Sequence, residues 1–241
     1  MKYFYLIISF VFLCSFNTFA AENNNESIKR AIKTNDINAI EGFINQGQNI
    51  NERDDRGYTP LHYALLKNRL KIAQKLIDAG ADINAPSSEN GLTPLLIATS
   101  RATELQEKAQ KFMEQSDGDV EKRVTEIKLK KYIAKQMNFA RKMLEMLIEN
   151  GADLNQETPL GTPLMNASTN PWNADIIDVL IKSGANVNAR DRNGRTALFY
   201  GEIFGGDSIS TKLLSYGADI TVKDNYGKTY MEVTADDFND N

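Results

Sequence analysis

The side chains that most often carry out catalysis are scarce in this chain of 241 residues. Its only histidine is His62, and its only cysteine is Cys14. Serine and cysteine nucleophiles usually need a histidine base, and structural zinc sites need several cysteine or histidine ligands. The chain also lacks the Gly-x-x-x-x-Gly-Lys-Ser/Thr phosphate loop. We therefore expect no enzyme activity, no cofactor and no metal.

Carboxylates are plentiful, but their grouping does not indicate catalysis. Asp54-Asp55 and Asp236-Asp237 are adjacent acids in an expected turn and tail, where solvation is their ordinary role. A carboxylate-based enzyme stays open as an alternative, and it would need a pocket that gathers acids from separate segments. The 28 basic and 32 acidic residues give a net charge of −4, which argues against nucleic acid as the partner.

The amino terminus has the layout of a secretory signal peptide, residues 1–20. Lys2 precedes an apolar run from Tyr3 to Phe16, and Thr18-Phe19-Ala20 is a small-residue cleavage site. This layout resembles a bacterial signal, so we expect a periplasmic or secreted protein. An uncleaved anchor and a lipoprotein acylated at Cys14 are the alternatives. Cleavage would remove the only cysteine, and no other segment is apolar enough to cross a membrane.

Two sequence landmarks recur along the rest of the chain. The first is a block such as Ala79-Gly80-Ala81-Asp82-Ile83-Asn84, whose glycines lie 33, 71, 33 and 33 residues apart. These glycines are Gly47, Gly80, Gly151, Gly184 and Gly217. The second landmark is a glycine before a helix start, at Gly57, Gly91, Gly161, Gly194 and Gly227. A fixed period of this length indicates a stacked repeat array.

Each landmark has a structural role that its residue types explain. Thr59 is a good helix N-cap, and Pro60 suits the first helical position. A second helix is expected from Leu70 to Ala79, and Gly80 would end it as a left-handed C-cap. The apolar residues of both helices would be buried by stacking on neighbouring repeats.

The segment Gly57-Tyr58-Thr59-Pro60-Leu61-His62 and its later copies resemble the ankyrin repeat. The resemblance covers about residues 25 to 240 and implies an all-α solenoid of about five units plus a truncated C-terminal unit. The expected domain is 21–241, with units at about 25–56, 57–90, 91–160, 161–193 and 194–226, and a partial unit at 227–241. It also implies that His62 serves the hydrogen bonding of the helix start.

The third unit departs from the pattern by an insertion at about 101–137. Gly91 and Gly151 lie 60 residues apart, whereas Gly57 and Gly80 lie 23 apart, so 37 residues are added. Apolar residues at steps of 3 and 4 predict a helical arm on each side of a turn at Ser116-Asp117-Gly118-Asp119. We expect an antiparallel helical hairpin, with a second helix from Val120 to Ile148 that carries Val124, Ile127, Ile133, Met137, Ala140 and Leu144 near one side.

The second arm is rich in basic residues. Six lie within 128–142, with no acid among them: Lys128, Lys130, Lys131, Lys135, Arg141 and Lys142. They could dock on an acidic protein or on an anionic membrane surface. A solvated helix face is the alternative.

The resemblance implies that the array binds another protein through the turns between repeats, called fingers, and through the inner helices. Arginine and tyrosine are common at interface hot spots. The candidate contact residues in or beside the fingers are Arg53, Arg56, Tyr58, Arg190, Arg192, Arg195 and Tyr226. Trp172, in the loop of the fourth unit, is a contact anchor or packs on its own repeat. We expect a monomeric, non-catalytic scaffold, with a membrane-surface tether through 128–142 as the alternative.

Overall fold

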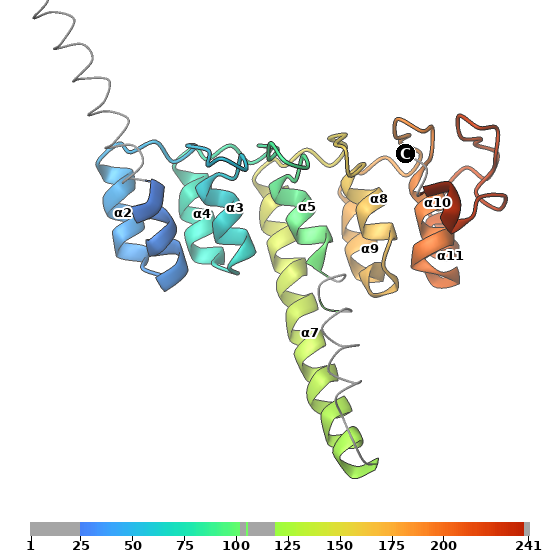
Figure 1. Cartoon of the computed structure of the whole chain (residues 1–241), viewed down its shortest axis with the longest axis horizontal. Coiled ribbons are helices and arrows are strands. Elements are labelled where there is room, and N and C mark those ends of the chain that lie inside the picture. The colour runs from blue at the N-terminus through green and yellow to red at the C-terminus, as the bar shows by residue number, and fades with distance from the viewer. Residues whose placement is uncertain (1–24, 102–104, 106–118, 239–241) are drawn as a thin grey trace, which may run out of the picture. The chain divides into compact units, whose positions relative to one another are not determined.

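The computed structural model describes residues 25–101, 105 and 119–238 (Figure 1). The predicted signal peptide 1–20, the first arm of the insertion (apart from Leu105) and the turn at 116–118 lie outside these residues. The described residues are all-α, with about ten helices that contact one another in pairs. The chain divides into two compact units, Met1–Asp82 and Ile83–Asn241, and each is described by itself.

The amino-terminal unit holds the first two repeats. A helix covers residues 25–34, followed by α2 (Ile37–Asn45), α3 (Pro60–Leu66) and α4 (Leu70–Asp78). Phe43, Ile44 and Ile77 on the helices of these repeats are half-buried. The buried core includes Ile28, Ile32, Ile40, Leu61, Leu65, Ile72 and Leu76.

Local hydrogen bonds explain why these helices begin and end where they do. The backbone amide of Thr59 donates to Nδ1 of buried His62 at 3.2 Å, so the only histidine serves the start of α3. Gly80 has φ of 91°, which confirms the left-handed C-cap after α4. The Arg69 side chain donates to the carbonyl oxygens of Ile32 and Lys33 in the last turn of the first helix, where Ile32 also accepts the amide of Asn35.

The carboxy-terminal unit holds the remaining repeats as helix pairs. The third repeat contributes α5 (Pro94–Thr99) and α7 (Asp119–Glu149), and the fourth contributes α8 (Pro163–Ser168), η1 (Pro171–Asn173) and α9 (Ala174–Lys182). The fifth contributes α10 (Ala197–Tyr200), the π-helical turn η2 (Gly201–Gly205) and α11 (Asp207–Ser215). A buried amide joins two repeats, because Asn173 Nδ2 donates to the carbonyl oxygens of Thr99 and Ala167.

Helix α7 confirms the predicted second arm of the insertion. Its 31 residues span about 46 Å, against 9 residues in α9, and Figure 1 shows it extending beyond α5, α8 and α9. It extends away from the end of these helices at which the fingers lie (Figure 1). Within the part of the chain that the structure describes, no helix has both the length and the apolar character that a membrane crossing requires.

The apolar side of α7 differs from the prediction at one position. Leu129, Ile133 and Met137 are half-buried, and Ala140 and Leu144 are buried, at steps of 4, 4, 3 and 4. Ile127 is instead 66% exposed. Six residues turn a helix through about 240°, so Ile127 and Ile133 cannot share a side.

The end of the chain departs from the repeat pattern. The notable feature of the last, partial unit is that its described residues lack the α-helix that begins each complete repeat: residues 228–234 are turns and irregular segments, and the short 3₁₀ helix η3 (Ala235–Phe238) follows. Phe238 packs against Tyr200 and Phe204 of the fifth repeat, with 5.1 Å between ring centroids in both pairs. The segment therefore folds back on the preceding repeat.

An asparagine at the end of the first landmark links each repeat to the next. In the amino-terminal unit, Asn51 Oδ1 accepts the amide of Asp82 at 2.8 Å. In the carboxy-terminal unit, Asn84, Asn155 and Asn188 accept the corresponding amides of the following repeat, each at 2.8 Å. The last copy has Thr221 at this position, and its hydroxyl bonds only to Asp219 of its own finger. Among the described residues, the asparagine thus occurs where a repeat follows.

Candidate functional site

The fingers of the carboxy-terminal unit present large side chains to solvent. The fingers in question are residues 153–161, 186–194 and 219–227. Leu160 is 40% exposed, Tyr226 is 63% exposed and the side chain of Arg192 is 75% exposed. We call these three residues the finger surface. Arg192 and Tyr226 were predicted from the sequence as contact residues, whereas Leu160 was not.

Hydrogen bonds hold two of these fingers side by side. The guanidinium of Arg190 donates to the carbonyl oxygen of Lys223 at 2.7 Å. Asn225 donates its side-chain amide to Arg192 O and its backbone amide to Asn193 O, each at 2.8 Å. Arg190 therefore has a structural bond as well as an exposed position. These bonds fix the backbones that carry Arg192 and Tyr226. Binding a partner would therefore cost these two fingers little conformational entropy.

The ion pair of Arg192 leaves it available to a partner. Its Nε lies 3.7 Å from Oε1 of Glu157 on the neighbouring finger, and both side chains are exposed. Exposed ion pairs of this kind contribute about 0–1 kcal/mol. The finger surface thus combines an aliphatic, a guanidinium and a phenol side chain on a fixed backbone. Such a surface can bury apolar area and donate hydrogen bonds to a protein.

The finger of the amino-terminal unit, residues 49–57, carries a polar cluster centred on Asp54. Tyr63 donates its hydroxyl to Asp54 Oδ2 at 2.6 Å, and Lys29 Nζ lies 3.4 Å from the same oxygen. Burial raises the pKa of the Asp54 carboxyl, but the bonds from Tyr63 and the Tyr58 amide outweigh it and hold the pKa below its ordinary value. Asp54 is therefore an ionised acceptor that fixes the finger.

The predicted contact residues of this finger differ in exposure. Arg53 and Arg56 are exposed, whereas Tyr58 is half-buried. The Arg56 guanidinium lies 4.8 Å from the centre of the Tyr58 ring and donates to the Tyr63 hydroxyl at 3.1 Å. Arg56 and Tyr58 thus form one stacked pair, which is accessible from the guanidinium side.

Arg195 was predicted as a contact residue, and the structure shows that this was wrong. Its side chain is 1% exposed and pairs with the equally buried carboxylate of Asp224, with 3.5 Å between Nε and Oδ2. It also donates to the carbonyl oxygen of Asp237 at 2.6 Å and lies under the Phe238 ring. The sequence could not show this, because the residues that cover Arg195 come from the end of the chain.

Trp172 occupies an intermediate position. It lies in η1 between α8 and α9 and is half-buried, and its backbone amide donates to the side chain of Asn170 at 2.9 Å. The neighbouring Asn173 is buried and bonds to two carbonyl oxygens. These hydrogen bonds fix the backbone of the loop, and the half-buried Trp172 keeps an exposed portion.

The lysines of α7 form a row rather than a broad face. Lys128, Lys131 and Lys135 follow one another at steps of 3 and 4, which places them along one line of the helix, and all three are exposed. Lys130 is exposed on another side of α7. We call Lys128, Lys131 and Lys135 the lysine row. Among the residues that the structure describes, no acidic side chain pairs with them, whereas Arg141 pairs with Glu145 at 2.8 Å.

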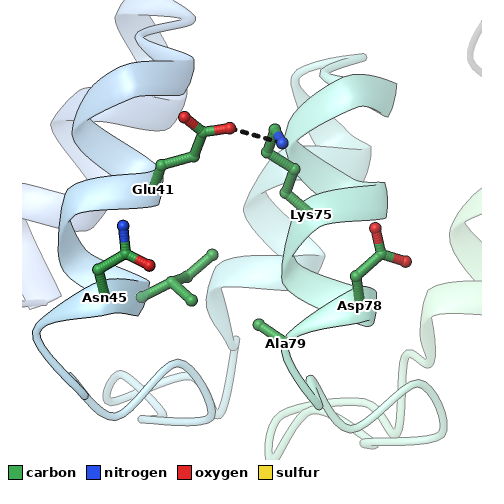
Figure 2. A pocket seen from close by; sticks show the side chains of 6 residues that line it. Glu41, Asn45, Lys75, Asp78 and Ala79 are labelled. Atoms are coloured by element: carbon green, nitrogen blue, oxygen red, sulfur yellow. Dashed lines mark ion pairs between the residues drawn. The ribbon is translucent and has the colours of Figure 1, made fainter.

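Two open hollows lie between neighbouring helices of the described residues. Figure 2 shows the one between α2 and α4, where Glu41 and Lys75 form an exposed ion pair at 2.5 Å. The other, between α7 and α9, is lined by Arg141, Asp175, Asp178, Val179 and Lys182. Within the described ranges, no group of three or more histidine, cysteine or carboxylate side chains is placed to hold a metal ion.

Comparison with known proteins gives one family. A family model described as "Ankyrin repeats (3 copies)" matches residues 11–87, 28–122 and 132–224. The matches cover most of the chain, and the first begins inside the predicted signal peptide. The second match ends at residue 122 and the third begins at residue 132, both within the insertion. Residues 123–131 of α7 therefore lie outside any match.

Similar curated proteins are larger than this chain. A putative ankyrin repeat protein of fowlpox virus is 33% identical over 75 residues, which is 31% of this chain and 13% of the viral protein. The mouse protein named "Ankyrin repeat, SAM and basic leucine zipper domain-containing protein 1" is 34% identical over 79 residues, 33% of this chain and 16% of its own length. The human 2-5A-dependent ribonuclease is 31% identical over 80 residues, 33% of this chain and 11% of the ribonuclease. The chain therefore spans a small part of these relatives.

Proposed function

Because the chain belongs to the ankyrin-repeat family, we propose that it is a non-catalytic scaffold that binds another protein through its finger surface. Ankyrin-repeat arrays are typically non-catalytic and bind proteins. The observation that carries the proposal is the exposure of Leu160, Arg192 and Tyr226, the last two on fingers whose backbones are joined by hydrogen bonds. Repeats bury the recurring residues in their stack and leave such variable side chains for recognition.

The chemistry of the finger surface supports a protein partner with both an apolar and an acidic element. Tyrosine and arginine carry a large share of binding energy in protein interfaces. Arg192 already faces the carboxylate of Glu157, which shows that its position suits an acid. A partner carboxylate would compete with Glu157 at little cost, because the existing pair is long and exposed.

We also propose that the protein acts outside the cytoplasm, in the periplasm or after secretion. The support is the sequence of residues 1–20, with its apolar run and its small residues before Ala21. Loss of Cys14 with this segment would leave a chain without cysteine. The array would then be stable through packing alone, which the buried aliphatic core of the described repeats is suited to provide.

The lysine row supports a second candidate, a tether to an anionic membrane surface. Its three lysines are exposed and belong to the middle of α7 (Asp119–Glu149), a helix that extends away from the fingers (Figure 1). Each lysine near an anionic leaflet contributes about 1 kcal/mol of attraction, which salt screens. The expected result is salt-sensitive binding to anionic vesicles that is lost in the triple variant Lys128→Glu, Lys131→Glu and Lys135→Glu.

Affinity capture with the chain from Ala21 to Asn241 tests the proposed function, and two variants locate the site. One variant carries Arg192→Glu and Tyr226→Ala, and the other lacks residues 101–137. Lys71→Glu, an exposed charge reversal on α4, is the matched control. We expect a stoichiometric partner with the wild type, the control and the deletion variant, and loss of that partner with the finger variant. Capture only in the presence of residues 101–137 would assign the site to the insertion, and no stoichiometric partner would contradict the proposal.

A further inference from the structure

The end of the chain lies against the fifth repeat as a ligand would. Phe238 packs with its ring edge to face against Tyr200 and Phe204, and the Arg195 guanidinium lies 4.1 Å from the centre of the Phe238 ring. Next to it, the Asp237 carboxylate accepts a bond from Lys228 Nζ at 2.6 Å. Figure 1 shows this terminal turn, in the darkest red, beside α10. We call Tyr200, Phe204, Arg195 and Lys228 the aromatic-basic site.

The site recognises both the backbone and the side chains of its occupant. Arg195 Nη2 donates to the carbonyl oxygen of Asp237 at 2.6 Å, while its flat face stacks on the following ring. Lys228 fixes the adjacent carboxylate, and this hydrogen bond lowers the pKa of Asp237 to about 2. The occupant is thus bound as an acid followed directly by an aromatic residue. Each of these features is one that a peptide from another protein could supply.

Some of the side chains that hold residues 234–238 are partly exposed. Phe204 stays 43% exposed with Phe238 against it, and the side chains of Lys228 and Asp237 are 40% and 23% exposed. Met231, in the segment that leads to η3, is 74% exposed, and Val233 is the buried apolar residue of that segment. A segment held in part by exposed contacts is expected to open at lower free energy than the packed repeats.

We propose that the aromatic-basic site is a docking site for an acidic protein segment that contains an Asp-Phe pair, and that the chain's own residues 234–238 occupy it until such a partner displaces them. This inference rests on the proposed function as a protein-binding scaffold, and it adds a second site that shares no residue with the finger surface. The terminal segment is an intramolecular ligand, and its release exposes Phe204, Tyr200 and the guanidinium of Arg195 together. A mere cap of the last repeat would not exchange with an external peptide.

The test uses a labelled peptide with the sequence of residues 229–241 and the full chain in two forms. One form is the wild type, and the other, called the emptied chain, carries Asp237→Asn and Phe238→Ala, which remove the carboxylate held by Lys228 and the ring held by Tyr200 and Phe204. Fluorescence anisotropy should show at least tenfold tighter peptide binding to the emptied chain. A control peptide with the same two substitutions should bind at least tenfold more weakly, and so should the wild-type peptide when Phe204→Ala is added to the emptied chain.

Several outcomes would overturn the proposal. They are no peptide binding to an emptied chain that is folded by circular dichroism, equal binding to both forms, or indifference to Phe204→Ala. If the emptied chain does not fold, hydrogen exchange on the wild type decides. Amides of residues 234–238 should exchange at least a hundredfold faster than those of α11, and equal exchange would show a permanent cap. A failed peptide test alongside a partner that is lost with Arg192→Glu and Tyr226→Ala would leave the proposed function standing.

Discussion

The asparagine links between repeats predict a local loss of stability when one is removed. Asn188 lies at the end of the fourth repeat and makes two bonds to the fifth. Its Oδ1 accepts the amide of Asp219 at 2.8 Å, and its Nδ2 donates to the carbonyl oxygen of Gly217 at 3.2 Å. Asn188→Ala removes both bonds and leaves the side-chain methylene in place.

The size of the effect follows from the number and exposure of these bonds. Each is exposed, and a neutral hydrogen bond contributes about 0.5–1.5 kcal/mol net. The loss of both bonds should therefore lower the free energy of unfolding by about 1–3 kcal/mol. In a chain of this size, each kcal/mol lowers the melting temperature by about 2–4 °C. Because repeats contact mainly their neighbours, the loss should fall on the fifth repeat.

Calorimetry measures the total effect, and hydrogen exchange with mass spectrometry locates it. We expect faster exchange in α10 and α11 of the Asn188→Ala variant and unchanged exchange in α3 and α4. Thr221→Ala is the matched control, because the same position in the last copy bonds only within its own finger. A melting temperature equal to that of the wild type, or an equal loss in both variants, would refute the reasoning.

Three further predictions concern single positions. Gly184→Val should lower the free energy of unfolding in urea by about 1–2 kcal/mol, because Gly184 has φ of +107°, which strains the backbone of a β-branched residue. The space around an added Cβ is open, so no clash contributes, and unchanged stability would contradict the prediction. Arg195→Met should cost about 3–5 kcal/mol, because the buried Asp224 carboxylate loses its positive partner and keeps only the amides of Tyr226 and Lys228. Calorimetry should show a larger loss for this variant than for Arg192→Met, whose arginine is exposed, and an equal loss would contradict the prediction. The pKa of Asp237 is lowered from 3.8 to about 2, so the contribution of its carboxylate to folding stability should be complete above pH 4 and lost as the pH falls toward 2. The stability difference between the wild type and Asp237→Asn should shrink over that window. A constant difference would contradict the assignment.

Much of the fold could be predicted, because the repeat dictates backbone conformation at fixed positions. Gly80, Gly151, Gly184 and Gly217 all have positive φ, as their place after a helix requires. The second arm of the insertion was also predictable, since the apolar residues before Leu147 keep helical spacing, and α7 runs from Asp119 to Glu149. These features depend on neighbours in sequence, which a single chain displays directly.

The candidate site was less predictable, because exposure in an array depends on residues far along the chain. Arg195 looked like a finger residue, but residues 224–238 cover it. Leu160 gave no signal, since a leucine beside a turn glycine is usually buried, yet it lies at a fingertip and is 40% exposed. The fold-back of Phe238 on Tyr200 likewise joins residues 38 positions apart with no repeat to relate them.

A binding titration with the captured partner tests the central claim most directly. Calorimetric titration of the wild-type chain should give one partner per chain. The Arg192→Glu and Tyr226→Ala variant should bind at least tenfold more weakly, while the Lys71→Glu control keeps the wild-type affinity. Equal affinity for all three chains would contradict the assignment of partner binding to the finger surface.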